Sequence, residues 1–265
     1  MRIGMAQLLV EGGEPERNLE RAEKLIRQGK EDGCDLILLP ETLDFAWTHP
    51  SALKEAESIP GRFSTFFSEL AVELNIWLCL GLTEKSGDKN RNTAILIDST
   101  GNIVLKYAKV NLLEVEFPYY EVGQKLEVVD TPFGKIGLNI CADNYIDSLY
   151  NGHMLARMGA QIILSPSSWT VDHFVTEEMD PYKTKWIEPL SIIARKYQIP
   201  MLSTTSVGYI VGGPYEGKKM VGCSLAVDET GILAQGEFNE FAGDLKVVNI
   251  TIKPIKKKGT QFSGL

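Results

Sequence analysis

The sequence predicts an α/β protein in which two mixed β-sheets pack together between two layers of helices, a four-layer αββα sandwich. Three observations lead to this prediction. Short, continuously apolar segments are typical of strands covered on both faces. Amphipathic segments alternate with them, and each has an apolar stripe wide enough to cover one face only. Hairpin turns interrupt this alternation, which favours mixed sheets over a plain doubly wound sheet.

The first elements alternate between strand and helix. We expect a strand over residues 3–10 and a helix over residues 15–33, where apolar residues recur every three or four positions. Residues 35–39 are continuously apolar and predict a buried strand, which ends at Pro40 and Glu41. In open α/β folds, the ends of such strands hold the functional groups.

The next elements introduce hairpins. A second amphipathic helix is predicted over residues 63–74, followed by a strand over residues 76–82. Two strands, 93–97 and 103–107, then flank an Asp-Ser-Thr-Gly turn and predict a hairpin. Similar turn sequences lie at residues 98–101, 130–134 and 228–231.

The most informative stretch is the apolar run 135–140, which stops at Cys141. A helical pattern follows Asn144, and a second apolar run begins at Ile162. This order predicts strand, sharp turn, helix and strand, with Cys141 beside the free N–H groups of a helix start. Such a position lowers the pKa of a thiol and suits a nucleophile, although most free cysteines are small buried hydrophobes. The remaining predicted elements are a helix over 185–197 and strands over 201–205, 223–227 and 245–252.

Composition limits the possible classes of protein. The 265 residues include 44% hydrophobic residues and no linker rich in Pro, Gly and Ser, so we expect a single domain. A net charge of −8 disfavours nucleic acid or a membrane surface as partner. Four scattered cysteines predict no disulfide framework, and the start of the chain enters a strand directly. We therefore expect a cytoplasmic protein.

Three charged residues are candidates for chemistry, each with an ordinary alternative. Glu41 leaves a buried strand but also fits an acidic cap on the following turn. Lys109 ends the second hairpin strand, and Glu116 lies in a loop rich in acids and aromatics; either fits a solvated surface position when taken alone.

Their combination resembles the nitrilase superfamily, the carbon–nitrogen hydrolases, over nearly the whole chain. The matching motifs are LLPET around Glu41, YAKVNL around Lys109, EFPYYEVG from Glu116 to Gly123, and GLNICAD around Cys141 followed by ARMGAQIILSPSSW. The resemblance implies the αββα sandwich, with residues 1–253 as the carbon–nitrogen hydrolase domain and 254–265 as a C-terminal tail. It also implies a homodimer or higher homo-oligomer, paired through the helices near the cysteine, and no cofactor or metal.

The resemblance assigns catalytic roles to four residues. Cys141 is the expected nucleophile, and Glu41 the general base that later protonates the leaving amine. Lys109 is expected to stabilise the oxyanion, with the backbone N–H of Ala142 as a second donor. Glu116 is expected to hold Lys109 or to orient substrate. The sequence predicts that Ala142, Asn144, Tyr119, Ser167 and Trp169 bind the substrate.

The predicted substrate is a small amide or N-carbamoyl compound, cleaved through a thioester. Ala142 and Asp143 follow the cysteine where true nitrilases usually have Trp and Glu, which favours the amidase and carbamoylase branches. No arginine lies near Cys141 to bind a carboxylate. Residues 171–181 form an acidic loop that contains Asp172, Glu177, Glu178 and Asp180. In one interpretation this loop lies at the edge of the pocket together with Trp169, Phe174 and Tyr119, and favours a neutral or amine-bearing amide. In the other interpretation it is a solvated loop.

Two other functional classes stay open at this point. One is an ammonia-donating glutaminase subunit that serves a separate synthetase. The other is a binding protein with the family fold and no activity, which the presence of Glu41, Lys109 and Cys141 disfavours.

Overall fold

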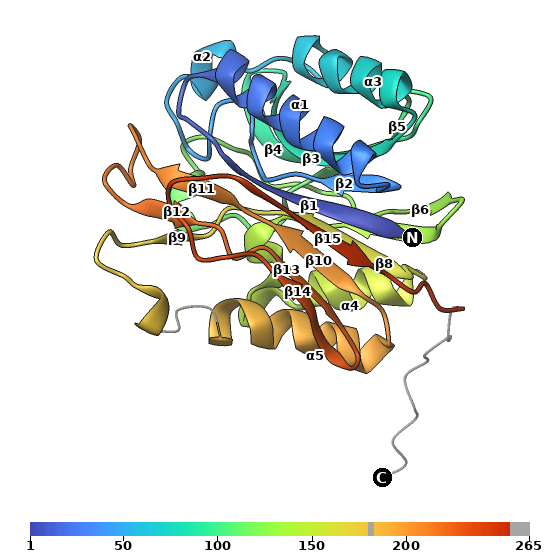
Figure 1. Cartoon of the computed structure of the whole chain (residues 1–265). Coiled ribbons are helices and arrows are strands. Elements are labelled where there is room, and N and C mark those ends of the chain that lie inside the picture. The colour runs from blue at the N-terminus through green and yellow to red at the C-terminus, as the bar shows by residue number, and fades with distance from the viewer. Residues whose placement is uncertain (180–182, 255–265) are drawn as a thin grey trace.

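The computed structural model describes residues 1–179 and 183–254, and its two β-sheets pack face to face between two layers of helices (Figure 1). The expected αββα sandwich is therefore confirmed. The larger sheet has the order β5-β4-β3-β2-β1-β11-β12-β9, with β15 also paired to β1. The smaller sheet has the order β14-β13-β10-β8-β7-β6. Both sheets mix parallel and antiparallel pairs.

Nine strands form the larger sheet. They are β1 (Arg2–Leu9), β2 (Leu36–Leu38), β3 (Trp77–Ser86), β4 (Lys89–Ile97), β5 (Ile103–Ala108), β9 (Thr170–Val171), β11 (Ser206–Tyr209), β12 (Lys219–Val221) and β15 (Asp244–Asn249). Six strands form the smaller sheet. They are β6 (Val128–Thr131), β7 (Gly134–Leu138), β8 (Ile162–Pro166), β10 (Met201–Thr204), β13 (Leu225–Asp228) and β14 (Gly231–Gln235).

The helices form the two outer layers. In Figure 1, α1 (Pro15–Glu31), α2 (Ala52–Glu55) and α3 (Arg62–Leu74) lie on the side of the larger sheet. On the opposite side, α4 (Tyr150–Arg157) and α5 (Glu188–Tyr197) cover the smaller sheet.

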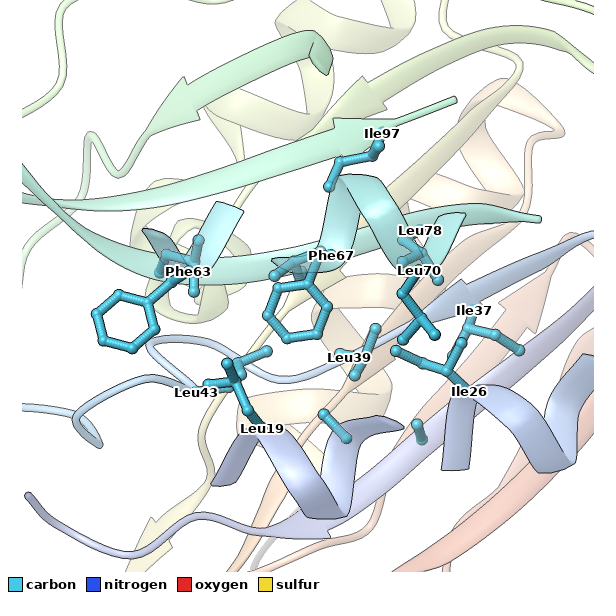
Figure 2. Packing of buried hydrophobic residues seen from close by; sticks show 14 of the residues in the cluster. Leu19, Ile26, Ile37, Leu39, Leu43, Phe63, Phe67, Leu70, Leu78 and Ile97 are labelled. Atoms are coloured by element: carbon cyan, nitrogen blue, oxygen red, sulfur yellow. The ribbon is translucent and has the colours of Figure 1, made fainter. Parts of the chain in front are cut away.

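Three apolar cores hold the four layers together. Figure 2 shows the outer core of the larger sheet, where Leu19 and Ile26 of α1 and Phe67 of α3 pack against strand residues such as Ile37 and Leu78. A second core joins the inner faces of the two sheets, and a third joins α4 and α5 to the smaller sheet. Each helix thus buries one stripe and each central strand buries both faces, as the sequence pattern predicts.

The main departure from the predicted elements follows Cys141. No α-helix starts there: two 3-10 turns, Cys141–Asn144 and Ile146–Ser148, come first, and α4 begins only at Tyr150. The predicted helix over 185–197 begins with a π-helical turn, Lys183–Ile187, before α5. Strands β9, β11 and β12 were not predicted, because they are short and lie in loop-like sequence.

Within residues 1–179 and 183–254, no helix has the length and apolar character needed to cross a membrane. The expected tail, residues 254–265, lies outside the described residues except for Pro254.

Candidate active site

Three strands of the two sheets and one 3-10 turn bring the candidate residues together. Glu41 follows β2, and Lys109 follows β5 in the same sheet. Glu116 ends a 3-10 turn, Glu114–Glu116, seven residues after Lys109. Cys141 lies beyond the end of β7 in the other sheet. The site is therefore formed where strands of both sheets end on the same side of the molecule.

A buried ion cluster is the centre of this site. The Lys109 Nζ atom lies 2.9 Å from Glu41 Oε1 and 2.9 Å from each carboxylate oxygen of Glu116. All three side chains are completely buried. An ion pair removed from water is stable only when its remaining hydrogen-bonding atoms are also satisfied, so the neighbours of these carboxylates decide the geometry.

Glu116 is held by donors from three other parts of the chain. Trp47 Nε1 donates to Oε1 at 2.8 Å, and the backbone N–H of Leu113 donates to Oε2 at 2.8 Å. Asn92 Nδ2 donates to Glu41 Oε1 at 2.5 Å and lies 3.4 Å from Glu116 Oε1. Every oxygen of Glu116 thus has at least two donors, which fixes the position of the carboxylate.

Glu41 differs from Glu116 in one respect. Its Oε2 atom is buried and has no hydrogen-bond partner among the described residues, whereas Oε1 accepts from Lys109 and Asn92. The backbone N–H of Glu41 donates to the Ser167 carbonyl oxygen at 3.3 Å, which ties Glu41 to the smaller sheet. The site therefore contains one fixed carboxylate and one carboxylate with a spare acceptor atom.

The environment shifts the pKa values of the charged groups in predictable directions. Burial raises the pKa of Glu41, Lys109 opposes this shift, and Glu116 reinforces it. Burial alone disfavours the Lys109 ammonium, but Glu116 and Glu41 outweigh burial and hold the pKa of Lys109 well above its ordinary value. Lys109 is therefore a permanent cation, while Glu41 is a stronger base than an exposed carboxylate.

Cys141 has a strained backbone and a protonated thiol. Its φ is +43°, in the left-handed region that non-glycine residues rarely occupy and that is found at functional turns. Its Sγ donates to the Ser168 carbonyl oxygen at 3.2 Å. Burial, and then the Glu41 charge, raise the pKa of the Cys141 thiol well above its ordinary value. The expected lowering of this pKa by a helix N-terminus is therefore wrong, since α4 starts nine residues later.

Hydrogen bonds to the Asp143 carboxylate stabilise the turn that contains Cys141. This carboxylate accepts from Tyr107 Oη at 2.6 Å, from the Ile140 and Asn111 backbone N–H groups at 2.9 and 2.8 Å, and from Asn151 Nδ2 at 2.7 Å. Burial raises the pKa of Asp143 to about 6. A residue that follows the nucleophile thus supports the turn rather than facing the reaction.

A cavity of about 370 Å³ opens beside Cys141. Its wall contains the aromatic side chains of Trp47, Tyr145, Trp169 and Tyr215, together with charged side chains farther along the chain. A volume of this size accommodates a small molecule. The remaining residues of the wall are Leu113, Ser168, Thr170, Val171, Asp172, Val175, Lys185 and Lys218.

The predicted substrate-binding residues divide into two groups. Trp169 lies on the wall of this cavity. Asn144 does not, because its amide bonds to Asn139 and to the Ser165 hydroxyl in the interior. The Ser167 hydroxyl likewise faces Ser165 and Ser203.

Ala142 and Tyr119 also lie away from the cavity wall. The Ala142 carbonyl accepts from Asn111 Nδ2 at 2.7 Å and from the Ser148 hydroxyl, so this carbonyl helps to hold the turn. Tyr119 borders a different hollow, of about 480 Å³.

The first part of the acidic loop lines the cavity through Val171, Asp172 and Val175, whereas its glutamates do not. Asp172 is on the wall, while Glu177, Glu178 and Phe174 are exposed and not part of it. Asp180 lies outside the described residues. Of the two alternatives for this loop, the solvated loop agrees with the positions of Glu177 and Glu178.

Sequence reasoning missed several residues of this site. Trp47 and Asn92 contact the carboxylates, while Lys185, Tyr215 and Lys218 line the cavity. None lies in a recognised motif, and no local pattern distinguishes them from surface or strand residues. By contrast, Gly123 in the matched EFPYYEVG motif has a clear reason: a Cβ there would lie 2.0 Å from the Ala108 carbonyl oxygen, directly before Lys109.

Comparisons with known proteins find relatives among nitrilases and amidases. A nitrilase of Pyrococcus abyssi is 30% identical over 173 residues, which are 63% of this chain and 65% of the nitrilase. A deaminated glutathione amidase of Dictyostelium discoideum is 34% identical over 188 residues, 63% of this chain and 64% of the amidase. The match thus spans slightly less than two thirds of each relative.

Solved structures share the fold at lower identity. An amidase of Nesterenkonia sp. AN1 superposes with a TM-score of 0.80 at 21% identity, covering 95% of this chain and 93% of the amidase. A carbon–nitrogen hydrolase of Helicobacter pylori G27 gives a TM-score of 0.81 at 22% identity, covering 94% and 89%. Residues 2–257 match the model of the carbon-nitrogen hydrolase family. This chain is a member of the carbon–nitrogen hydrolase family.

Proposed function

We propose that this protein is a thiol amidohydrolase that cleaves the C–N bond of a small linear amide or N-carbamoyl compound through a cysteine thioester. The observation that supports this most directly is the buried Glu41–Lys109–Glu116 cluster beside the cavity that Cys141 lines. It combines a nucleophile, a base and a cation, which are the groups that amide hydrolysis needs.

The first step transfers the thiol proton to Glu41. Because burial keeps the Cys141 thiol protonated, a base must remove its proton as the sulfur attacks. Glu41 Oε2 is the acceptor that no other described donor occupies. The sulfur forms a bond to the carbonyl carbon, and the Lys109 ammonium and the Ala142 backbone N–H stabilise the negative oxygen.

The following steps return the enzyme to its starting state. The tetrahedral intermediate breaks its C–N bond as Glu41 gives its proton to the departing amine or ammonia, which leaves an acyl thioester on Cys141. A water molecule then attacks the thioester while Glu41 takes its proton. Collapse releases the carboxylic acid and returns that proton to the sulfur.

The carboxylates of Glu116 and Glu41 have different roles because their hydrogen-bond partners differ. Glu116 receives donors on both oxygens and so acts as a positioning residue for Lys109. Glu41 keeps one oxygen for proton transfer, and its raised pKa makes it a stronger base than an exposed carboxylate.

The protein is also proposed to pair with a second copy through α4. Four exposed apolar residues recur every four positions along this segment: Ile146 before α4, Tyr150 and Met154 on α4, and Met158 directly after it. The neighbouring helix α5 also has an exposed apolar residue, Ile192. Exposed apolar residues at this spacing form one stripe, which is typical of a surface that is covered by a partner.

Ammonia release from a panel of ω-amides, N-carbamoyl amines, N-carbamoyl amino acids and nitriles tests the proposed activity. Cys141→Ala should abolish turnover, whereas Cys34→Ala should not, because Cys34 is an equally buried thiol in the outer core of the larger sheet. Turnover that survives in Cys141→Ala would contradict the mechanism. Turnover that needs an added nucleotide-consuming synthetase would point to a glutaminase subunit instead.

A further inference from the structure

Two lysines lie on the wall of the cavity that contains Cys141. Lys218 precedes β12, and Lys185 lies in the π-helical turn before α5. Asp172 is the one carboxylate on the same wall. Among the described residues of the wall, the charged groups therefore sum to one excess positive charge, although the whole chain has a net charge of −8.

Lys218 is placed at this wall by its neighbours. Its Nζ lies 2.7 Å from Asp172 Oδ1 and 4.6 Å from the centre of the Tyr215 ring, and its backbone carbonyl accepts from the Ile210 N–H at 2.9 Å. The side chain is 36% exposed and that of Asp172 is 47% exposed. An exposed ion pair contributes little free energy, so a ligand anion can replace or join Asp172 at low cost.

Lys185 adds a second cation at the same place. Its side chain is exposed, and in the described part of the chain it forms no ion pair, although its charge contributes to lowering the pKa of Asp172. Asp172 pairs with Lys218, and among the described residues no second carboxylate on the wall balances the charge of Lys185. A carboxylate between the two ammonium groups would balance it through charge-assisted hydrogen bonds.

From this arrangement we infer that Lys218 and Lys185 form an anion subsite, and that the substrates are amides with a carboxylate at the end remote from the scissile bond. The inference rests on the proposed function, since it places the amide at Cys141 and the carboxylate at the lysines. The aromatic side chains on the same wall, including Trp47 and Tyr145, suit a short apolar spacer.

The same observation revises the substrate expected from the acidic loop. Glu177 and Glu178 lie outside the cavity wall, so they do not make the pocket acidic. Binding of a substrate carboxylate does not require an arginine beside Cys141, because Lys185 and Lys218 supply the positive charges. A carboxylate is thus favoured over the neutral or amine-bearing amide.

A matched pair of compounds separates charge from shape. Succinamate and 4-methylpentanamide have the same size, but only the first has a carboxylate. Binding of both is measured by calorimetry on Cys141→Ala, and on the same background with Lys218→Met, Lys185→Met or Asp172→Asn added. Lys246→Met is the control, because Lys246 forms a similarly exposed pair with Asp244 on a strand outside the cavity wall.

We expect Cys141→Ala to bind succinamate at least tenfold more tightly than 4-methylpentanamide. Lys218→Met should reduce this ratio about tenfold, Lys185→Met should also reduce it, and Lys246→Met should leave it unchanged. Asp172→Asn should increase the ratio about two- to fivefold, because it removes a competing anion. A ratio near one, or a ratio that Lys218→Met does not alter, would overturn the subsite.

Turnover of the two compounds by the enzyme without substitutions tests the anion subsite separately from the proposed amidohydrolase activity. Hydrolysis of both compounds at equal rates would overturn the subsite and leave the amidohydrolase intact. Hydrolysis of neither, together with tight and lysine-dependent binding of succinamate, would uphold the subsite and overturn the proposed reaction.

Discussion

Replacement of Glu116 by glutamine is the sharpest test of the buried cluster. The substitution keeps the shape of the side chain but removes its charge and one of its two acceptor oxygens. If the amide oxygen takes the place of Oε1, it still accepts from Lys109 and Trp47. The amide NH₂ then faces the Leu113 N–H and the Lys109 ammonium, which are both donors.

The cost in stability follows from these contacts. One buried donor, the Leu113 N–H, loses its acceptor, which costs about 1–3 kcal/mol. Lys109 loses one charged partner but keeps Glu41 at 2.9 Å, so the total stays near the lower end of the range of about 3–5 kcal/mol for breaking a buried pair. We expect a loss of about 3 kcal/mol in the free energy of unfolding, measured by urea denaturation at pH 7.

The pH dependence of activity gives a second, signed readout. Activity requires ionised Glu41, so kcat/KM should fall as the pH drops through the raised pKa of Glu41. The Glu116 charge helps to raise this pKa, so Glu116→Gln should move the acid limb of the profile to lower pH. The rate at the optimum should fall about 100-fold, because Lys109 loses its fixed position.

Glu84→Gln is the matched control. Glu84 is also buried, but its partner Lys106 is 43% exposed, so this pair contributes at most about 1 kcal/mol and the pH profile should stay in place. An acid limb that moves upward in Glu116→Gln, or an unfolding free energy equal to that of the unaltered protein, would refute the reasoning about the cluster.

Three further substitutions have outcomes of defined sign. Asn92→Leu removes a donor that lowers the pKa of Glu41, so the acid limb should move to higher pH, opposite to Glu116→Gln; a shift in the same direction would contradict the assigned contacts. Gly81→Ala would place a Cβ 2.6 Å from the Glu41 Cα, so kcat should fall at least tenfold while KM changes less, as measured by steady-state kinetics. Met154→Glu should yield monomers in sedimentation velocity with unchanged unfolding free energy, since Met154 is 48% exposed; an unaltered dimer would exclude the α4 surface.

Much of the fold could be predicted from the sequence because its elements depend on local patterns. The stripe of α1, the apolar run of β2 and the turns of the β4–β5, β6–β7 and β13–β14 hairpins are all visible within ten to twenty residues. The helix predicted after Asn144 is present as α4 but begins only at Tyr150, because apolar spacing alone does not distinguish successive 3-10 turns from the first turns of an α-helix.

The sequence by itself determined the family resemblance and the positions of Glu41, Lys109, Glu116 and Cys141 along the chain. Only the tertiary structure decided how they meet. Glu41 and Lys109 are 68 positions apart, and Trp47 and Glu116 are 69 apart, so no local pattern encodes their contacts.

Contacts between residues far apart in the sequence also set the pKa of the Cys141 thiol and the charge of the cavity wall. Burial and the charge of Glu41, which is 100 positions away in the sequence, raise the pKa of Cys141, whereas the expected helix start would have lowered it. The cations at the cavity come from two separate segments, the π-helical turn that contains Lys185 and the loop that contains Lys218, and these residues are 33 positions apart in the sequence. Local residue types thus define the available chemistry, while long-range packing sets protonation, orientation and the charge that a substrate meets.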